Sequence, residues 1–218
     1  QIFEDGEEIQ VTCFWNPWHN SPIQHVEIVD STNKSLLETQ QQFGTHMTAK
    51  TQTKGRGRYE RTWLSPIGSY SGSWILNPKL PISPGLIQIF AGMCVIRCLK
   101  TFGISNLYQK WPNDIFTDEG KIGGILVESQ SIGNQLKIVL GIGLNLSTHI
   151  SLSEEGYPHL DRKNPIEFHK FDEEIHAYLA SIFECREELS KPDFELLGKE
   201  AYQLICDFGT PFYRNKEW

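Results

Sequence analysis

The chain has 218 residues, 39% of them hydrophobic and 22% charged, and carries a formal charge of −7 at pH 7. These values fit a globular protein with one substantial domain, and the acidity argues against sequence-independent nucleic-acid binding, which needs a surplus of Lys and Arg. The five scattered cysteines argue against a disulfide framework, and neither a signal-peptide pattern nor a run of ~20 apolar residues is present, so we expect a cytoplasmic protein without a membrane span.

The first third of the chain predicts one helix and four short strands. The helix is expected over residues 31–43, because Ser31 and Thr32 suit a helix N-terminus and Gly44 suits the end. The strands are segments in which polar and apolar residues alternate, or in which strand-forming residues follow a turn. They are expected at residues 8–14, 24–29, 46–51 and 72–77.

The clearest helix is expected over residues 83–102. Ser83 and Pro84 suit its N-terminal cap and first turn. It is apolar on nearly every side, which predicts a central helix rather than one on the surface. Cys94 and Cys98 lie four residues apart within it. A metal-binding pair is one interpretation, but two small buried side chains are strongly favoured, and the histidines show no metal-binding spacing.

The remaining chain predicts three successive strands followed by two helices. The strands are expected at residues 106–116, 121–128 and 135–146, and the helices at 172–189 and 192–206. Because strands joined by tight turns pair antiparallel, the fold class is α+β, with a largely antiparallel mixed β-sheet packed with helices. We expect residues 1–208 to form the domain and residues 209–218 to begin a small C-terminal β-module that is cut short.

The first chemical signal is the loop Gly55-Arg56-Gly57-Arg58. Its glycines let the backbone approach a ligand, and its two arginines can bind a phosphate or carboxylate. Trp63 follows the loop, and an indole in this place can stack on a purine. The alternatives are a solvated surface turn and an indole that only packs.

The second signal is the segment Lys110-Trp111-Pro112-Asn113-Asp114. Pro112 cannot donate to a strand ladder and therefore belongs at an edge or a break. The oxygens of Asn113 and Asp114 can then hold a magnesium-bound phosphate. Lys121, just before two glycines, can bring an ammonium group to a site that the backbone also approaches. The alternatives are a simple Asn-Asp turn and a solvated lysine.

Two more segments have both a structural and a functional interpretation. Residues 30–33 (DSTN) either cap a helix or bind a polar head group at its N-terminus. Residues 141–145 (GIGLN) end a strand with two glycines and one amide. They either form a narrow slot in which Asn145 recognises a heterocycle edge, or the glycines serve sheet packing alone.

The order of these segments is more informative than any one of them. Between Val26 and Leu146 the chain contains DSTN, QTxGRGRxxRxW, SPxG, KWPND, KxGGILVE and GxGLN. In this order they resemble the catalytic domain of biotin protein ligases. The resemblance implies a fold like that of class II aminoacyl-tRNA synthetases and biotin ligases. It also implies that biotin and ATP, with Mg²⁺, form biotinyl-5′-AMP, and that biotin then passes to a lysine of a biotin carboxyl carrier domain of a carboxylase. A homodimer is an option that the sequence leaves open.

The resemblance also implies roles for single residues. Lys121 matches the lysine that bridges the biotin carboxylate and the α-phosphate, and Arg56 and Arg58 match catalytic cations, with Arg58 retaining the adenylate. Biotin contacts are implied for Ser31, Thr32, Gln52, Gly55, Arg56, Lys121, Gly124 and Leu126. Contacts with ATP or the adenylate are implied for Arg56, Gly57, Arg58, Trp63, Lys110, Asn113 and Asn145. Metal binding is implied for Asn113 and Asp114.

The chain also departs from the family pattern. Glu60 stands where glycine is common, and residues 68–75 lack the Asn-Leu pair often found after SPxG. About 30 residues precede DSTN, too few for a winged DNA-binding domain, so no DNA binding is expected. Two alternatives are a lipoate or octanoate ligase or transferase of the same fold and a non-catalytic biotin sensor. The Gly/Arg and KWPND segments disfavour the first, and the intact cations disfavour the second.

Overall fold

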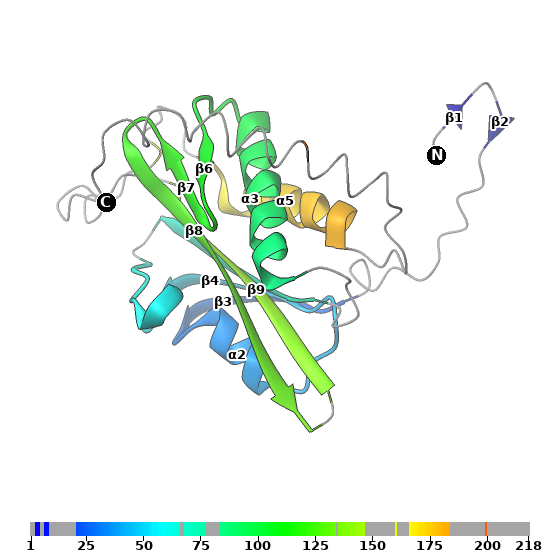
Figure 1. Ribbon diagram of the computed structural model, residues 1–218, viewed down its shortest axis with the longest axis vertical. Coiled ribbons are helices and arrows are strands. Elements are labelled where there is room, and N and C mark those ends of the chain that lie inside the picture. The colour runs from blue at the N-terminus through cyan, green and yellow to red at the C-terminus, as the bar shows by residue number, and fades with distance from the viewer. Residues whose placement is uncertain are drawn as a thin grey trace.

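Seven strands form one mixed sheet in the spatial order β3-β4-β5-β9-β8-β7-β6 (Figure 1). The computed structural model describes residues 3–4, 7–8, 21–65, 68–76, 83–133, 135–146, 160, 166–183 and 199. β3 and β4 are parallel, and the other neighbouring strands are antiparallel. The strands are β3 (Ile23–Val29), β4 (His46–Gln52), β5 (Ser69–Leu76), β6 (Tyr108–Lys110), β7 (Asp114–Thr117), β8 (Gly120–Ile132) and β9 (Gln135–Asn145). A separate pair is formed by β1 (Phe3–Glu4) and β2 (Glu7–Glu8).

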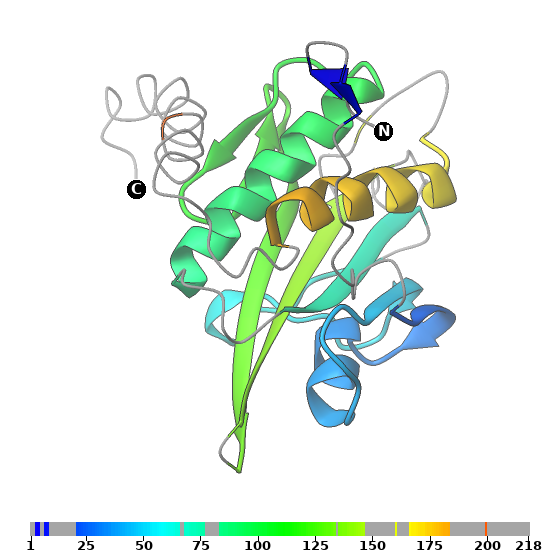
Figure 2. The same ribbon diagram turned by 90° about the vertical axis from the view of Figure 1, so that its right-hand side faces the viewer.

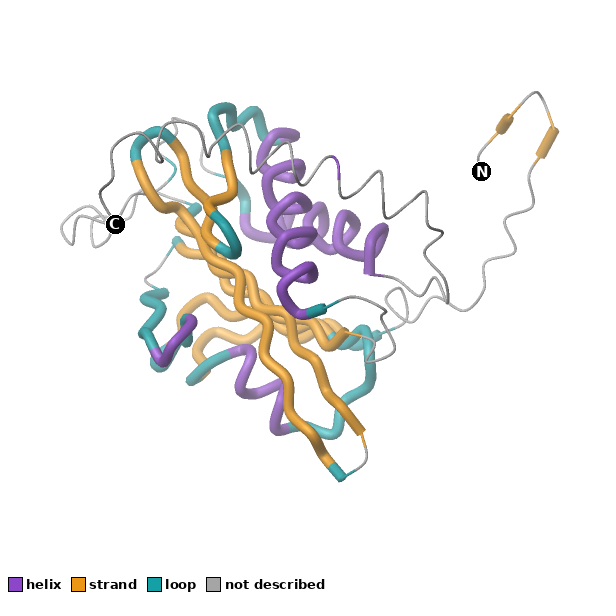
Figure 3. Tube along the Cα trace, viewed as in Figure 1, coloured by secondary structure: helices purple, strands orange, loops and turns teal. Residues whose placement is uncertain are grey.

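Helices cover both faces of this sheet, as the twisted layer of strands in Figure 3 makes visible. Successive strand residues point to opposite faces, so Trp74 packs with α3 (Pro84–Thr101) and α5 (Phe168–Phe183), whereas Ile75 packs with α2 (Thr32–Glu38). α3 and α5 lie against each other over the larger core (Figure 2). The smaller cluster packs α2 against β5 and β9 at the centre of the sheet, and Ser73 of β5 donates a hydrogen bond to Thr32 in the first turn of that helix.

The central helix α3 forms as expected. Ser83 caps it by accepting a hydrogen bond from the Leu86 amide at 3.4 Å, and Pro84 opens its first turn. By length and composition α3 could cross a membrane, although no segment of the sequence was expected to be long and apolar enough to do so. However, 67% of it is buried inside the structure, so its packing accounts for its apolar composition. Cys94 and Cys98 are buried free cysteines, as the favoured interpretation held.

Most other predicted elements are confirmed with shifted ends. The strands expected at residues 24–29, 46–51 and 72–77 are β3, β4 and β5, and the helix expected at 172–189 is α5, which begins earlier. The helix expected over 31–43 ends at Glu38, because residues 39–42 are all polar and offer no apolar face to bury. The helix expected at 192–206, the module at 209–218 and most of the strand at 8–14 lie outside the described residues.

The single strand expected over residues 106–116 is wrong. β6 ends at Lys110 and β7 begins at Asp114, and the two pair antiparallel around a turn that contains Trp111 and Pro112. Pro112 has no amide hydrogen for a ladder, so the strand breaks at this residue. The break has a functional consequence, because it brings Lys110 and Asp114 opposite each other at the end of a hairpin.

A buried polar cluster joins α5 to the sheet. Asp172, only 5% exposed, accepts hydrogen bonds through Oδ1 from the Tyr70 hydroxyl at 2.6 Å and from His46 Nε2 at 2.8 Å. The His46 ring stacks on Trp74 with ring centroids 4.2 Å apart. The Trp74 indole N–H donates to His176 Nδ1 at 3.1 Å. Since β4, β5 and α5 all contribute, the cluster fixes the position of the helix on the sheet.

Candidate functional site

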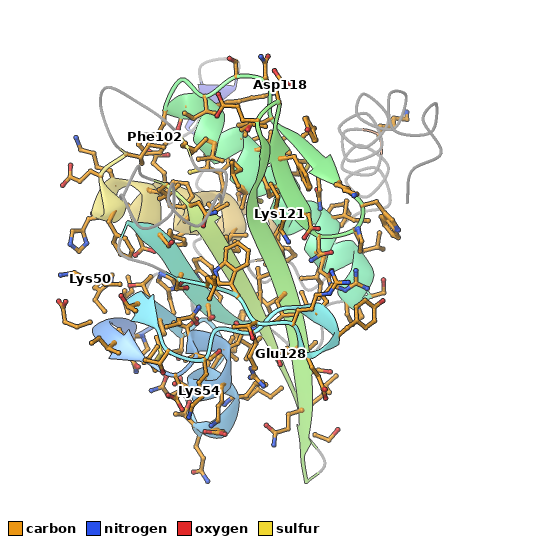
Figure 4. All side chains as sticks on the ribbon, turned by 90° about the vertical axis from the view of Figure 1, so that its left-hand side faces the viewer. Lys50, Lys54, Phe102, Asp118, Lys121 and Glu128 are labelled. Atoms are coloured by element: carbon orange, nitrogen blue, oxygen red, sulfur yellow. The ribbon has the colours of Figure 1, made fainter. Side chains whose placement is uncertain are left out.

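The described residues enclose a cavity of about 310 Å³ between the N-terminus of α2, the loop after β4, the turn between β6 and β7, and the strands β8 and β9. Figure 4 shows Lys121 and Glu128 on β8, the long strand beside this region. Most of the predicted site residues line the cavity. They are Ser31, Thr32, Gln52, Arg56, Gly57, Arg58, Trp63, Lys110, Asn113, Asp114, Lys121, Gly124 and Leu126.

Two predicted site residues lie outside the described cavity wall. Gly55 forms the base of the arginine loop, where its carbonyl accepts from the Trp63 amide at 2.9 Å. A Cβ on Gly55 would lie 2.3 Å from the Trp63 carbonyl oxygen, so glycine is needed for this close approach. Asn145 is buried at the end of β9, and its carbonyl accepts from the Leu160 amide. Contacts of Gly55 and Asn145 with a ligand, like those of the residues that line the cavity, stay predictions.

One wall of the cavity is a network of neutral hydrogen-bonding groups. The Gln52 carbonyl oxygen accepts from the Thr32 amide at 2.8 Å and from the Thr32 hydroxyl at 3.1 Å. The Gln52 amide group donates to Ser65 at 3.1 Å and to Ser71 at 3.3 Å. Both amide hydrogens and both acceptor positions of Gln52 are thereby used within the protein. Gln52 therefore holds Thr32 in place, and Ser31, which caps α2, lies next to it.

The floor of the cavity is a stretch of strand without side chains. Gly143 of β9 and Gly124 of β8 are paired across the sheet, and the Trp63 indole lies on them. A Cβ on Gly143 would come 2.6 Å from the indole, whereas one on Gly124 would keep an ordinary 3.6 Å. The Lys121 ammonium lies 5.6 Å from the centre of the Trp63 ring system. The glycines thus create a flat slot, which the Trp63 indole occupies.

The cavity wall is cationic although the whole chain is acidic. Among the described residues that line it, five carry a positive charge and one carries a carboxylate. The cations are Arg56, Arg58, Arg61, Lys110 and Lys121, and the carboxylate is Asp114. Positive charges gathered in a concave site attract anions, and arginine and lysine are suited to phosphates and carboxylates.

Two of these cations contact the segment that was predicted to bind metal and phosphate. The Lys121 ammonium lies 2.8 Å from Asp114 Oδ1, and Arg58 Nη1 donates to Asn113 Oδ1 at 3.2 Å. The Lys121 and Asp114 side chains are 40% and 29% exposed. Such partly exposed pairs are weak, so a ligand anion can compete with Asp114 for the ammonium group.

The same segment can bind a magnesium ion only when phosphates supply further ligands. In the described part of the chain no group of three or more His, Cys, Asp or Glu side chains could hold a metal ion by itself. Asp114 and Asn113 supply one carboxylate and one amide oxygen. Mg²⁺ commonly takes one or two carboxylates and completes its shell with waters and substrate phosphates, so these two residues suit an ion that arrives with a nucleotide.

The arginine loop has an unusual backbone next to Arg58. Tyr59 and Glu60 have φ angles of 54° and 59°, in the left-handed region that costs roughly 1–2 kcal/mol for a residue with a side chain. Arg58 lies 4.9 Å over the Tyr59 ring and donates to its hydroxyl at 3.1 Å. Glu60 therefore occupies a backbone position that glycine would adopt without strain, which gives its departure from the family pattern a structural meaning.

Several residues of the site had no predicted role, among them Arg61, and two of them connect distant parts of the chain. Asn33 lines the cavity, and Glu128 pairs with Arg56 at 3.2 Å. Both lie inside recognised segments, DSTN and KxGGILVE, but a single Asn or Glu has no local signature of a partner far away in the chain. Their importance becomes visible only when α2, β8 and the arginine loop are brought together.

The model of the biotin/lipoate A/B protein ligase family matches residues 25–145. The chain belongs to this family. The match includes all of the predicted site segments, from DSTN to GxGLN. Family membership thus confirms the resemblance that the motifs indicated.

Curated relatives in this family agree with that assignment. The bifunctional ligase/repressor BirA of Escherichia coli is 34% identical over an alignment of 126 residues, and the match covers 55% of this chain and 39% of BirA. The human biotin–protein ligase is 33% identical over an alignment of 121 residues, and the match covers 51% of this chain and 16% of that protein. The chain therefore spans well under two thirds of the length of these relatives.

Solved structures of family members share the fold. The biotin protein ligase from Aquifex aeolicus in complex with biotin and ATP has a TM-score of 0.65 and 26% identity, and the match covers 85% of this chain and 74% of that one. The biotin protein ligase from Leishmania major in complex with biotinyl-5-AMP has a TM-score of 0.64 at 23% identity, covering 84% and 81%. The second match bears on the fold alone.

Proposed function

We propose that this chain is an ATP-dependent biotin protein ligase, which activates biotin as biotinyl-5′-AMP and transfers it to a lysine of a biotin carboxyl carrier domain. The observation that carries the proposal is the cavity itself. Five cations face one carboxylate, next to a neutral polar wall on one side and an aromatic slot on the other. This is the arrangement needed to bring a neutral polar head group, a carboxylate, a phosphate chain and a purine together.

The first reaction step joins two anions. A carboxylate oxygen of biotin attacks the α-phosphorus of ATP, the bond from that phosphorus to the bridging oxygen breaks, and pyrophosphate leaves. Lys121, Arg56 and Arg58 offset the negative charge of both reactants and of the transition state. Mg²⁺, held by the phosphates with Asn113 and Asp114, would neutralise the leaving pyrophosphate. Arg58 then retains the adenylate, because its guanidinium can bind the remaining phosphate.

The second step uses the adenylate as an acyl donor. The neutral amine of the carrier lysine attacks the biotinyl carbonyl carbon, the bond from this carbon to the phosphate oxygen breaks, and AMP leaves with the bonding pair while the amine releases a proton. The rigid wall of Ser31, Thr32 and Gln52 keeps the biotin ring in one orientation during both steps. We also propose that the protein acts in the cytoplasm, where carboxylase carrier domains and ATP are available to it.

The direct test is the transfer of radiolabelled biotin to a purified carrier domain in the presence of Mg-ATP. We expect label on the carrier lysine with biotin and none with labelled lipoate under the same conditions. Efficient transfer of lipoate would place the protein in the lipoate branch of its family. Tight binding of biotin without any transfer would instead support a sensor, although a pure biotin sensor has no need of five cations in the cavity.

The aromatic slot allows a separate prediction for the nucleotide. In Gly143→Ala the new methyl group displaces the Trp63 indole, since its Cβ would lie 2.6 Å from the ring. We expect the KM for ATP to rise about tenfold, the equivalent of one lost stacking contact, with little change in the KM for biotin. Gly124→Ala is the comparison for the KM of ATP, because its Cβ also lies in the cavity but meets Trp63 at an ordinary 3.6 Å and leaves the indole in place. Equal effects of both substitutions on ATP would contradict the slot.

A further inference from the structure

Glu128 connects two parts of the site that are distant in the sequence. Its Oε1 lies 3.2 Å from Arg56 Nη1 in the arginine loop, and its Oε2 accepts a hydrogen bond from Asn33 Nδ2 of α2 at 2.9 Å. Glu128 itself stands on β8 (Figure 4), two residues beyond Leu126, and is not among the described residues that line the cavity. Glu128 can therefore act on the site only through the residues that it contacts.

The Asn33 end of this connection is rigid. Asn33 is 4% exposed, accepts from the Ser73 hydroxyl at 2.6 Å and also donates to the Leu126 carbonyl at 3.4 Å. It fits because Gly141 has no side chain: a Cβ there would lie 2.3 Å from Asn33 Oδ1. Buried side chains with all their partners satisfied hold one geometry. Asn33 thus holds the Glu128 carboxylate in a constant position on the sheet.

The Arg56 end belongs to a more exposed element. The Arg56 side chain is 38% exposed, against 23% for Glu128. Residues 55–61 follow β4 and belong to none of the seven strands of the sheet. An isolated bridge pairs Arg56 with Thr62. A fixed carboxylate on the sheet and a charged side chain on a loop form an attachment point for that loop.

We propose that Glu128 is a positioning residue: through Arg56 it anchors residues 55–61 over the cavity and so slows the departure of bound ligands. The nature of those ligands, biotin and its adenylate, rests on the proposed function, whereas the anchor itself does not. The competing explanation is that Glu128 only offsets the charge of Arg56. The two explanations predict opposite signs, because loss of a mere counter-charge would bind anions more tightly and slow their release.

The first experiment reads the anchor without any ligand. Trypsin can cleave after Arg56, Arg58 and Arg61, and mass spectrometry of the fragments reports each cut. In Glu128→Gln one carbonyl oxygen must replace two carboxylate oxygens, so Arg56 and Asn33 lose a shared acceptor. Since ion pairs of this exposure contribute up to about 1 kcal/mol, we expect loop cleavage to accelerate about fivefold.

Two further variants make this result specific. Glu27→Gln removes the same charge from an exposed pair, in which Glu27 of β3 is 77% exposed and contacts Lys50 of β4, and it is expected to leave loop cleavage unchanged. Glu128→Asp keeps the charge but shortens the side chain by one methylene, so the anchor predicts faster cleavage for it as well. Unchanged cleavage in both Glu128 variants, at wild-type stability in urea, would overturn the anchor.

The second experiment measures the dissociation of biotin, and of adenylate formed with Mg-ATP, from each protein. The anchor predicts about fivefold faster release from Glu128→Gln, with unchanged release from Glu27→Gln. Slower release from Glu128→Gln would establish the counter-charge explanation and contradict the anchor. If the wild-type protein forms no adenylate, the proposed function fails, but the trypsin result still decides the anchor by itself.

Discussion

Lys121→Ala is expected to reduce biotin transfer to a carrier lysine by at least about a hundredfold, which is the effect of removing one preorganised charge from a developing anion. The ammonium group lies 2.8 Å from Asp114 and 5.6 Å from the centre of the Trp63 ring. It therefore stands between the edge where phosphates are expected and the Trp63 indole, on which a purine is expected to stack. In the proposed reaction, the α-phosphate and the biotin carboxylate meet at this point.

The measurement is the single-turnover rate of adenylate formation. The release of labelled pyrophosphate from ATP reports this rate. We expect the loss in the rate of this step rather than in the affinity for biotin, because Ser31, Thr32 and Gln52 are unaffected. Lys50→Ala serves as the matched control. It removes a lysine that is 65% exposed and pairs with Glu27 on the neighbouring strand. Normal adenylate formation by Lys121→Ala would refute the assigned mechanism and leave family membership untouched.

Asp172→Ala is expected to destabilise the fold by about 3–5 kcal/mol, as is typical when one partner of a buried ion pair is removed. One oxygen of Asp172 accepts from both His46 and Tyr70, and the His46 side chain is fully buried. The other nitrogen of that imidazole, Nδ1, faces the Ser73 carbonyl oxygen at 3.0 Å, which can only accept. Both ring nitrogens therefore face acceptors, and removal of Asp172 takes away the partner of one of them together with the partner of the buried Tyr70 hydroxyl.

The effect should depend on pH in a defined direction. Burial raises the pKa of Asp172, but the hydrogen bond and charge of His46 and the hydrogen bond from Tyr70 outweigh it, so the pKa lies below its ordinary value of 3.8. A lowered pKa stabilises the folded state at pH values above that of the unfolded carboxyl and loses this contribution as the pH falls through the folded pKa. The difference between wild type and Asp172→Ala should therefore shrink below about pH 4.

Urea unfolding at pH 7 and at several values below pH 4 measures this dependence. Glu173→Ala is the control, because the neighbouring side chain is exposed on the same helix, and it should change the free energy of unfolding by no more than about 0.5 kcal/mol. A pH-independent difference for Asp172→Ala would show that the cluster contributes by packing alone. Equal destabilisation by both substitutions would show that the effect belongs to the helix and not to the cluster.

Local sequence patterns predicted the elements that have clear signals of their own in the sequence. Ser83, Pro84 and a continuous apolar run identify α3 in the sequence, and alternation identifies β3. The strand expected over residues 106–116 failed because β-propensity on both sides of Pro112 outweighed the proline in the sequence interpretation. In the structure the missing amide decides, and a hairpin turn replaces a ladder. The helix after Ser31 ended early for lack of apolar residues, a signal that was present in the sequence.

The site could be predicted as a set of residues but not as a set of contacts. The order of the motifs predicted that Arg56, Lys121 and Trp63 share one site. All three line the cavity, which confirms that they lie together. The partners of these residues follow from tertiary structure alone. Arg56 and Glu128 are 72 positions apart, and no local rule relates them. The positive φ at Tyr59 likewise has no sequence signal, because that residue type is uncommon in the left-handed region.

The glycines of β9 have a consequence for how such a site can change over time. Gly141 leaves room for Asn33, and Gly143 leaves room for Trp63, so two consecutive inward positions of one strand each accommodate a side chain from another element. A methyl group gained at residue 141 would displace Asn33 and, through Glu128, disturb the arginine loop without touching a ligand. Substitutions at residues 33, 128 and 141 are therefore expected to depend on one another. In a diverging lineage they are free to vary together, while each alone is constrained by the other two.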